Sequence, residues 1–284
     1  MTGCRVPRLR TVRVTLLGTG NPIPDPERAG PATLVKAGGA FLLVDAGRGV
    51  LMRLAAAGVT APQLTAVLVT HLHSDHLTDL NDLITTRWVM TFAPSPLEVV
   101  GPPRISEVVD GMLASLRPDI EYRLAHHADL TWEPPVEVRE LTTGVAWSND
   151  DVRVTAAPTE HRPASPSVAY RIEHAGSAVV LAGDTIPCSG LDQLSAGADV
   201  LVHTVIRDDI LLGLPFPRLH DVCDYHSSVA QAAQTAARAG VDTLVLTHQV
   251  PGPGPDDDDV WRDLAAAHFS GPIVVGRDLV SFDV

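Results

Sequence analysis

Lysine is nearly missing from this 284-residue chain, in which Lys36 is the single lysine. Lysine and arginine together number 21 against 34 aspartates and glutamates, which gives a formal net charge of −13 and a pI near 5.2. A surface with this balance repels polyanions at long range. The composition argues against a protein that coats nucleic acid through a broad basic face, so any nucleic acid would have to bind at a local site.

Cysteines and long apolar runs are also scarce. The three cysteines, Cys4, Cys188 and Cys223, show no Cys-x-x-Cys spacing, which argues against a disulfide framework and favours a reducing cytoplasm. No stretch approaches the ~20 apolar residues that a membrane span needs. The first residues, Met1 to Arg8, lack the apolar segment of a signal peptide. We therefore predict a cytoplasmic protein that does not associate with membranes.

One short stretch is rich in side chains that bind metals. The apolar run Ala66 to Thr70 is typical of a buried strand, and His71-Leu-His-Ser-Asp-His76 follows it. Three imidazoles and one carboxylate within six residues serve no hydrophobic face. This donor set suits Zn²⁺, with Mn²⁺ or Fe²⁺ as substitutes. The pattern predicts a metal site at the end of a strand.

Further ligand-type residues follow apolar runs downstream. Four predicted strands end at a potential ligand, namely His161, Asp184, His203 and His248. Ligands in layered α/β proteins gather where strands end and loops converge, and a buried aspartate there needs a partner or a metal. Asp45 also follows a predicted strand. For this residue we favour a role in ordering the strand-to-helix turn over direct binding of a metal.

The alternation of elements predicts an α/β fold with no internal linker. Strands are expected at 11–17, 33–36, 40–45, 66–70, 97–100, 136–141, 152–157, 177–182, 199–203, 242–248, 273–276 and 279–282. Helices are expected at 50–59, 77–90, 104–116, 227–240 and 260–267. Gly18 to Pro26 is expected to be a structured, turn-rich loop. We predict one domain over residues 11–284 and a flexible segment over residues 1–10.

Three polar features have a structural interpretation beside a functional one. His126 and His127 lie within 118–151, which is expected to hold short strand-like pieces, and they are interpreted as solvated. The acidic run Asp256 to Asp259 is expected at the start of a helix, where carboxylates are favourable. His226 precedes the helix at 227–240, where it could either cap the helix or bind an anionic group beside the helix N-terminus.

The motif His71 to His76 resembles the His-x-His-x-Asp-His signature of the metallo-β-lactamase superfamily. Further segments are similar to ribonuclease Z, which trims transfer-RNA 3′ ends. They are Leu16-Leu-Gly-Thr-Gly20, Leu181-Ala-Gly-Asp-Thr-Ile-Pro-Cys188, His226-Ser-Ser228 and Leu244-Val-Leu-Thr-His248, together with His161 and Ala169-Tyr-Arg-Ile172. The likeness runs from about residue 12 to the C-terminus and is nearest to the ribonuclease Z-like proteins of actinobacteria. It implies a four-layer αββα sandwich in which helices flank two mixed β-sheets.

The resemblance also implies a dinuclear site. It assigns three ligands to each of two Zn²⁺ ions and one bridging ligand to both: His71, His73 and His161; Asp75, His76 and His248; and Asp184. Asp75 would also orient the attacking water or accept its proton, and His226 would stabilise the phosphoryl oxygens or protonate the leaving group. His203 is a further candidate for substrate binding. The substrate would be a phosphodiester or another anionic ester, and the chain would form a homodimer.

Three features depart from the ribonuclease Z pattern. Bacterial ribonuclease Z carries a long flexible arm, which grips transfer RNA, between the third histidine and the bridging aspartate, whereas His161 and Asp184 are only 23 positions apart here. The His-Glu-Ala-Thr motif reads His203-Thr-Val-Ile206, which lacks the glutamate that partners the catalytic histidine. Asp208 and Asp209 are candidate substitutes. No basic stripe is evident along the chain.

These observations predict a dinuclear metal hydrolase, with phosphodiester cleavage favoured and a transfer-RNA precursor as one candidate substrate. An arylsulfatase or another ester hydrolase on the same scaffold is the alternative enzyme. A non-catalytic metal-binding partner protein is the alternative from another class.

Overall fold

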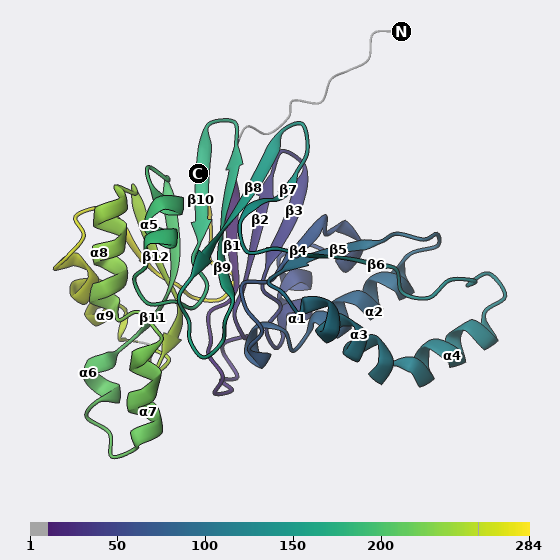
Figure 1. Cartoon of the computed structure of the whole chain (residues 1–284), viewed down its shortest axis with the longest axis horizontal. Coiled ribbons are helices and arrows are strands. Elements are labelled where there is room, and N and C mark those ends of the chain that lie inside the picture. The colour runs from purple at the N-terminus through teal and green to yellow at the C-terminus, as the bar shows by residue number, and fades with distance from the viewer. Residues whose placement is uncertain (1–10, 255) are drawn as a thin grey trace, which may run out of the picture.

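Two seven-stranded β-sheets lie face to face at the centre of the structure (Figure 1). This computed structural model describes residues 11–254 and 256–284, so the segment 1–10, for which we predict flexibility, lies outside the described residues. One hydrophobic cluster fills the space between the sheets, and another covers the outer face of each sheet. The resulting layers confirm the αββα sandwich, whereas the single domain over residues 11–284 stays a prediction.

The first sheet contains strands from the N-terminal half and the last strand of the chain, in the order β14-β1-β2-β3-β4-β5-β6. β3 to β6 are parallel to one another and the other pairs are antiparallel, so the sheet is mixed. The strands are β1 (Arg13–Gly18), β2 (Ala32–Ala37), β3 (Ala40–Val44), β4 (Ala66–Leu68), β5 (Leu97–Gly101), β6 (Val136–Glu140) and β14 (Ser281–Asp283).

The second sheet contains the remaining strands, in the order β13-β12-β11-β10-β9-β8-β7. β10 to β13 are parallel, and β7 to β10 form an antiparallel meander. The strands are β7 (Gly144–Ser148), β8 (Val152–Thr159), β9 (Ser167–His174), β10 (Ser177–Leu181), β11 (Val200–Ile206), β12 (Thr243–Val250) and β13 (Ile273–Val275).

Helices cover the outer faces of both sheets. On the first sheet, α1 (Val50–Ala56), α2 (Leu80–Met90) and α3 (Ile105–Ser115) pack over the outer cluster, and α4 (Arg117–His126) continues from α3. On the second sheet the corresponding helices are α5 (Ser189–Ser195), α8 (Val229–Ala239) and α9 (Asp258–Ala266). The short helices α6 (Asp208–Leu211) and α7 (Pro217–Asp221) project from the same side of the molecule as α8 (Figure 1). Three 3₁₀ turns are η1 (Ala61–Gln63), η2 (Ser74–His76) and η3 (Val222–Asp224).

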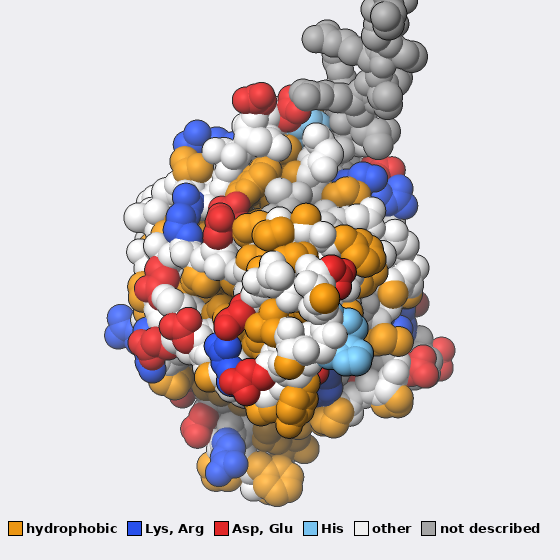
Figure 2. All heavy atoms as spheres, turned by 90° about the vertical axis from the view of Figure 1, so that its right-hand side faces the viewer, with side chains coloured by type: hydrophobic (Ala, Val, Ile, Leu, Met, Phe, Trp, Pro, Cys, Tyr) orange, Lys and Arg blue, Asp and Glu red, His pale blue; other side chains and the backbone are white. Residues whose placement is uncertain are grey.

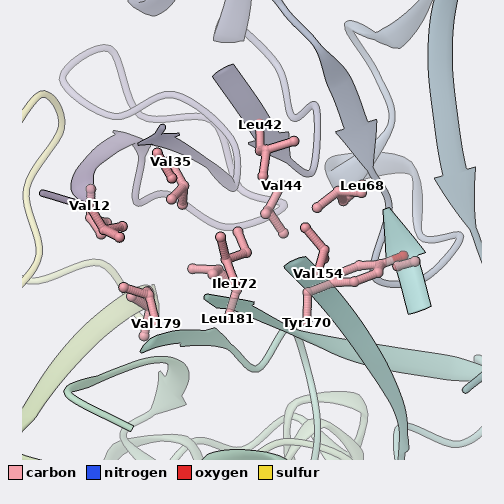
Figure 3. Close-up of a cluster of buried hydrophobic side chains, with 14 of the residues drawn as sticks. Val12, Val35, Leu42, Val44, Leu68, Val154, Tyr170, Ile172, Val179 and Leu181 are labelled. Carbon is pink, nitrogen blue, oxygen red and sulfur yellow. The ribbon is translucent and has the colours of Figure 1, made fainter. Parts of the chain in front are cut away.

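The inner faces of the two sheets share one core (Figure 3). Alternation along the strands turns Val35 and Leu42 of the first sheet toward Ile172 and Leu181 of the second, and all four are at most 3 % exposed. Burial of each such side chain contributes about 1.5–3 kcal/mol. Tyr170 lies in the same core, and its hydroxyl donates to the carbonyl of Val69 at 2.8 Å. This bond ties the second sheet to the segment that leads into the histidine motif.

The structure corrects two expectations from the sequence. The region 118–151 begins with helix α4 rather than with a strand-like piece, although β6 and β7 follow as expected. β11 does not end at His203 but continues to Ile206, which places His203 inside the strand. His126 and His127 are exposed, as predicted, and Asp258 and Asp259 lie in the first turn of α9. Among the described helices, none is long and apolar enough to cross a membrane.

Candidate metal centre

The seven predicted ligands meet at one edge of the two sheets, where they form two groups of potential metal-binding atoms. The motif between β4 and α2 supplies four of them, and the others follow β8, follow β10 or lie near the end of β12. Within each group the ligand atoms lie within 4.8 Å of one another, and the groups are His71, His73, His161 and Asp184, and Asp75, His76 and His248. These are the two ligand sets that the family resemblance implies.

In the first group, three imidazole nitrogens converge on one point. His73 Nδ1 lies 3.1 Å from both His71 Nε2 and His161 Nε2. Two ligands of a tetrahedral zinc ion at about 2.0–2.1 Å would be separated by about 3.4 Å, close to the spacing observed. The three rings are therefore arranged as ligands of one ion would be.

Asp184 lies between the two groups. Its Oδ2 atom is 3.8 Å from the Nε2 atoms of His71 and His161, and it is 3.4 Å from His76 Nε2 and 3.5 Å from His248 Nε2. The other carboxylate oxygen, Oδ1, is buried and has no hydrogen-bond partner within the described part of the chain. One carboxylate thus reaches both groups, as a bridging ligand must.

The second group is built around His76. Its Nε2 atom is buried without a hydrogen-bond partner among the described residues, 3.7 Å from Asp75 Oδ2, which in turn lies 3.2 Å from His248 Nε2. A buried imidazole nitrogen that finds no protein partner is costly unless another group binds it. The donor set and these unpartnered atoms fit a divalent cation such as Zn²⁺.

Hydrogen bonds to the far side of two rings, those of His76 and His161, fix which nitrogen of each faces the centre. Asp45 accepts from His76 Nδ1 at 2.7 Å, and Asp45 also accepts from the main-chain and hydroxyl groups of Thr70. The carbonyl of Tyr225 accepts from His161 Nδ1 at 2.8 Å. Such outer contacts orient metal-binding histidines. Asp45 is outside both ligand groups and orders the turn and His76, in agreement with the favoured expectation.

A close approach of two loops brings Asp184 to the motif. Gly183, with φ +62°, lies so near Thr70 that a Cβ atom on it would come within 2.7 Å of the threonine Cβ. A side chain at this position would push the two loops apart. Glycine is therefore required before Asp184 for the carboxylate to reach His71.

A buried polar network holds the strand end that carries His248. This histidine has φ +48°, an uncommon conformation for a residue with a side chain. The side chains of two residues in the loop between β1 and β2 bind the next residue, since Asn21 donates to the carbonyl of Gln249 and Arg28 donates to its side-chain oxygen. The turn-rich loop predicted at 18–26 thus supports the strand end that carries His248.

Burial and charge set the protonation of the two groups in opposite directions. Burial lowers the pKa of His161 to about 4 and holds the pKa of His71 well below its usual range. Burial also opposes protonation of His76, but the carboxylates of Asp184 and Asp45 outweigh it and raise the pKa of that ring. Because a metal ligand must be a neutral imidazole, the first group is the better prepared to bind metal at neutral pH.

His226 lies beside the centre, as predicted, but it does not cap the following helix. Ser228 is the N-cap of α8 and forms a capping box with Gln231. His226 Nε2 is 3.2 Å from Asp184 Oδ2, and its Nδ1 atom donates to the carbonyl of Val222 at 3.0 Å. The ring is buried and aimed at the bridging position, where it could donate a proton to a departing group.

His203 is also buried, with no exposed surface. Its Nδ1 atom donates to the carbonyl of Thr204 at 2.7 Å, and burial lowers its pKa to about 4. The ring has no surface exposed to solvent, and its role in substrate binding stays a prediction. Of the two candidate substitutes for the missing glutamate, Asp209 pairs with Arg207, whereas the ring nitrogens of His226 face the Val222 carbonyl and Asp184.

Comparison with known proteins identifies the family. The model of the "Beta-lactamase superfamily domain" matches residues 41–249. "Ribonuclease Z" of Mycobacterium bovis (strain BCG / Pasteur 1173P2) is 59% identical over 275 residues, which cover 96% of this chain and 98% of the relative. The chain belongs to the ribonuclease Z family. A second member, from Mycolicibacterium gilvum (strain PYR-GCK), is 59% identical over 270 residues and 94% of each chain.

Solved structures show that the fold of this ribonuclease Z family member is shared more widely. The metallo-β-lactamase fold protein YhfI from Bacillus subtilis matches with a TM-score of 0.77 and 23% identity, over 97% of this chain and 100% of that chain. The short form of human tRNase Z matches with a TM-score of 0.70 and 23% identity, over 95% and 98%. Family membership and the two ligand groups together establish a metal-dependent hydrolase of the ribonuclease Z type.

Proposed function

We propose that this protein is an endoribonuclease that uses two Zn²⁺ ions to cleave a phosphodiester bond in transfer-RNA precursors. The position of Asp184 carries the proposal, because its Oδ2 atom lies within 3.8 Å of histidines in both ligand groups. A carboxylate shared by both groups would hold two ions close together, and such a pair would support in-line displacement at phosphorus. The name of the relatives, ribonuclease Z, supports RNA as the substrate.

The chain's own residues would orient the reaction. When bound, the ions would supply Lewis-acid activation of water and of the phosphoryl oxygens. Asp75 Oδ2, beside His248 and His76, would orient the attacking water or accept its proton. His226, fixed through Nδ1 by the carbonyl of Val222, would donate a proton from Nε2 to the leaving oxygen.

The short connection between His161 and Asp184 is compatible with this proposal. It consists of the hairpin of β9 and β10, which turns through Ala175 and Gly176 without an arm. The relative from Mycobacterium bovis aligns over 98% of its length, so the two chains are of nearly the same size. On the face that carries α3 and α4, basic and acidic side chains are interspersed (Figure 2). RNA would therefore bind close to the centre.

One parallel assay tests the proposal. Metal-loaded protein would be incubated with a 3′-extended transfer-RNA precursor, bis-p-nitrophenyl phosphate and p-nitrophenyl sulfate. We expect cleavage of the precursor near the 3′ end of its acceptor stem and slower turnover of the small phosphodiester. Cleavage of the sulfate alone would favour the arylsulfatase alternative, and no turnover of any ester with metal bound would favour the non-catalytic one.

The metal content and assembly state are tested separately. Elemental analysis of protein purified without added metal should give two zinc ions per chain, and Mn²⁺ or Fe²⁺ in their place would correct the choice of metal. Homodimerisation is measured by light scattering during size-exclusion chromatography, with a mass of about twice the 30.1 kDa of one chain expected. Cytoplasmic location stays a prediction.

A further inference from the structure

A cavity of about 310 Å³ opens beside the candidate metal centre. Three loops from both halves of the chain form it: Leu72 and His73 of the motif, Pro103 and Arg104 between β5 and α3, and Pro163 to Pro166 between β8 and β9. None of the interactions that assemble the metal centre uses Arg104 or the two prolines that bound the last loop. The cavity is therefore a separate compartment that shares one wall with the centre.

His73 belongs to both the cavity and the metal centre, and its partial exposure connects the two sites. Of the seven candidate ligands, which the structure describes in full, His73 is the one that is partly exposed, while the other six are buried. Its ring lines the cavity and its Nδ1 atom faces the first ligand group. A substrate whose phosphate sits at the centre can thus extend past His73 into this cavity.

The chemistry of the walls selects the kind of group that fits. Leu72, Pro103, Pro163 and Pro166 supply apolar surface, and the cavity residues include no carboxylate. Arg104 is the cation at the rim, with its side chain 73% exposed and in an ion pair with Glu107 at 3.0 Å. Apolar walls with one cation suit a planar aromatic group that is joined to an anion.

A nucleobase has these properties. Proteins hold unpaired bases by stacking them on histidine rings and on arginine guanidinium planes, both of which this cavity offers. Its volume is at the lower end of the range for small-molecule sites, so it suits one nucleotide and excludes a base pair. Only a base that has left the helical stack could enter.

We propose that this cavity is a subsite for the base of one nucleotide that flanks the scissile phosphate. The inference rests on the proposed cleavage of RNA and adds a requirement for a single-stranded base at the cleavage position. Arg104 is placed for it by an unusual main chain: φ is +80°, and the residue is the N-cap of α3. The Arg104 amide donates to a carboxylate oxygen of Glu140, which holds this loop in place.

Three RNAs test the subsite. They are the same 3′-extended precursor with all bases present, with an abasic nucleotide on the 5′ side of the scissile bond, or with one on its 3′ side. We expect the value of kcat/KM for the wild-type protein to fall by about tenfold or more for one abasic RNA only, since stacking of a single base supplies an effect of that order.

Two matched variants connect the effect to the cavity. Arg104→Gly removes the guanidinium group and tolerates the positive φ, so the main-chain contact with Glu140 can persist. Arg117→Gly is the control, because Arg117 is likewise an exposed arginine paired with a glutamate, Glu133, but lies outside the cavity. The difference between intact and abasic RNA should shrink to under about threefold in Arg104→Gly and stay as in wild type in Arg117→Gly.

The outcomes separate this inference from the proposed function. Equal cleavage of all three RNAs by the wild type, or an unchanged difference in Arg104→Gly, would overturn the subsite while leaving RNA cleavage in place. Failure of the metal-loaded wild type to cleave any of the RNAs would overturn the proposed function and this inference with it. Circular dichroism of each variant would show that the fold is retained.

Discussion

Replacement of His203 by leucine should make the protein more resistant to acid. The ring is completely buried inside β11, its Nε2 atom has no hydrogen-bond partner within the described residues, and burial lowers its pKa from 6.5 to about 4. In the unfolded chain the same ring regains its ordinary pKa. Between these two values the unfolded state binds more protons than the folded state, so stability falls as the pH falls.

The size of the effect follows from the two pKa values. His203 costs almost nothing well above pH 6.5, where the ring is neutral in both states, and most of its cost is reached as the pH falls to about 4. One pKa unit corresponds to about 1.4 kcal/mol, so the loss is about 2 kcal/mol at pH 5 and about 3 kcal/mol at pH 4. His203→Leu should remove this loss, although the missing bond to the Thr204 carbonyl costs on the order of 1 kcal/mol at every pH.

Urea unfolding of metal-free protein at pH 7.5 and at pH 5 measures the difference. The free energy of unfolding should fall by about 2 kcal/mol less in His203→Leu than in wild type between the two pH values. His126→Leu is the control, because His126 is exposed on α4, and its pH dependence should match that of wild type. If this change in the free energy of unfolding differs by less than about 0.5 kcal/mol between His203→Leu and wild type, the reasoning is refuted. A ring that stays neutral because it is buried would give a larger difference.

Four further predictions concern the centre. Asp184→Asn should lower the metal content from two ions per chain toward none, measured by elemental analysis, and retention of both ions would rule out bridging. His226→Gln should retain both ions but reduce kcat by about 10²- to 10⁴-fold, and a loss of metal would instead make it a ligand. On acidification, the ion beside His76 should leave at a higher pH than the ion beside His71, because the raised pKa of His76 lets protons compete with the metal for that ring at a higher pH. The metal content per chain is measured as the pH is lowered, and release of both ions at the same pH would contradict this prediction. Asp209→Asn should keep kcat within about twofold of wild type, because the Asp209 carboxylate binds Arg207. A larger loss of kcat would make Asp209 the substitute for the missing glutamate beside His226.

The sequence was sufficient to find the seven candidate ligands because four of them form one motif after a predicted strand and the other three lie at or near the ends of apolar runs. His161 and Asp184 follow β8 and β10 in this manner, and these two strands run in the same direction on either side of the antiparallel β9, so their ends lie at one edge of the sheet. His203 obeys the same sequence pattern but lies inside its strand. The residues after it, Thr204 to Ile206, are buried and continue the strand, so a histidine within a buried strand could not be distinguished from one at its end.

The short helices were the least predictable part of the fold. α4 has a mixed surface in which Ile120 is its buried residue, so the sequence lacks a clear apolar stripe. α6 and α7 are four and five residues long, too short for a periodic pattern. Both depend on tertiary packing instead of intrinsic helix propensity.

The way His226 is oriented explains why its partner was not visible in the sequence. A glutamate partner would have appeared as a residue type at a fixed position, and the chain has Thr204 in that place. The structure provides the carbonyl of Val222 instead, on the 3₁₀ turn that ends the segment containing α6 and α7. Every residue type has this main-chain carbonyl, so the amino acid at position 222 gives no sign of the interaction in the sequence. The carbonyl of Tyr225, the residue that follows this turn, holds His161 in the same manner. One turn thus orients both a candidate ligand and the candidate acid, and a change in its conformation would displace the two rings together.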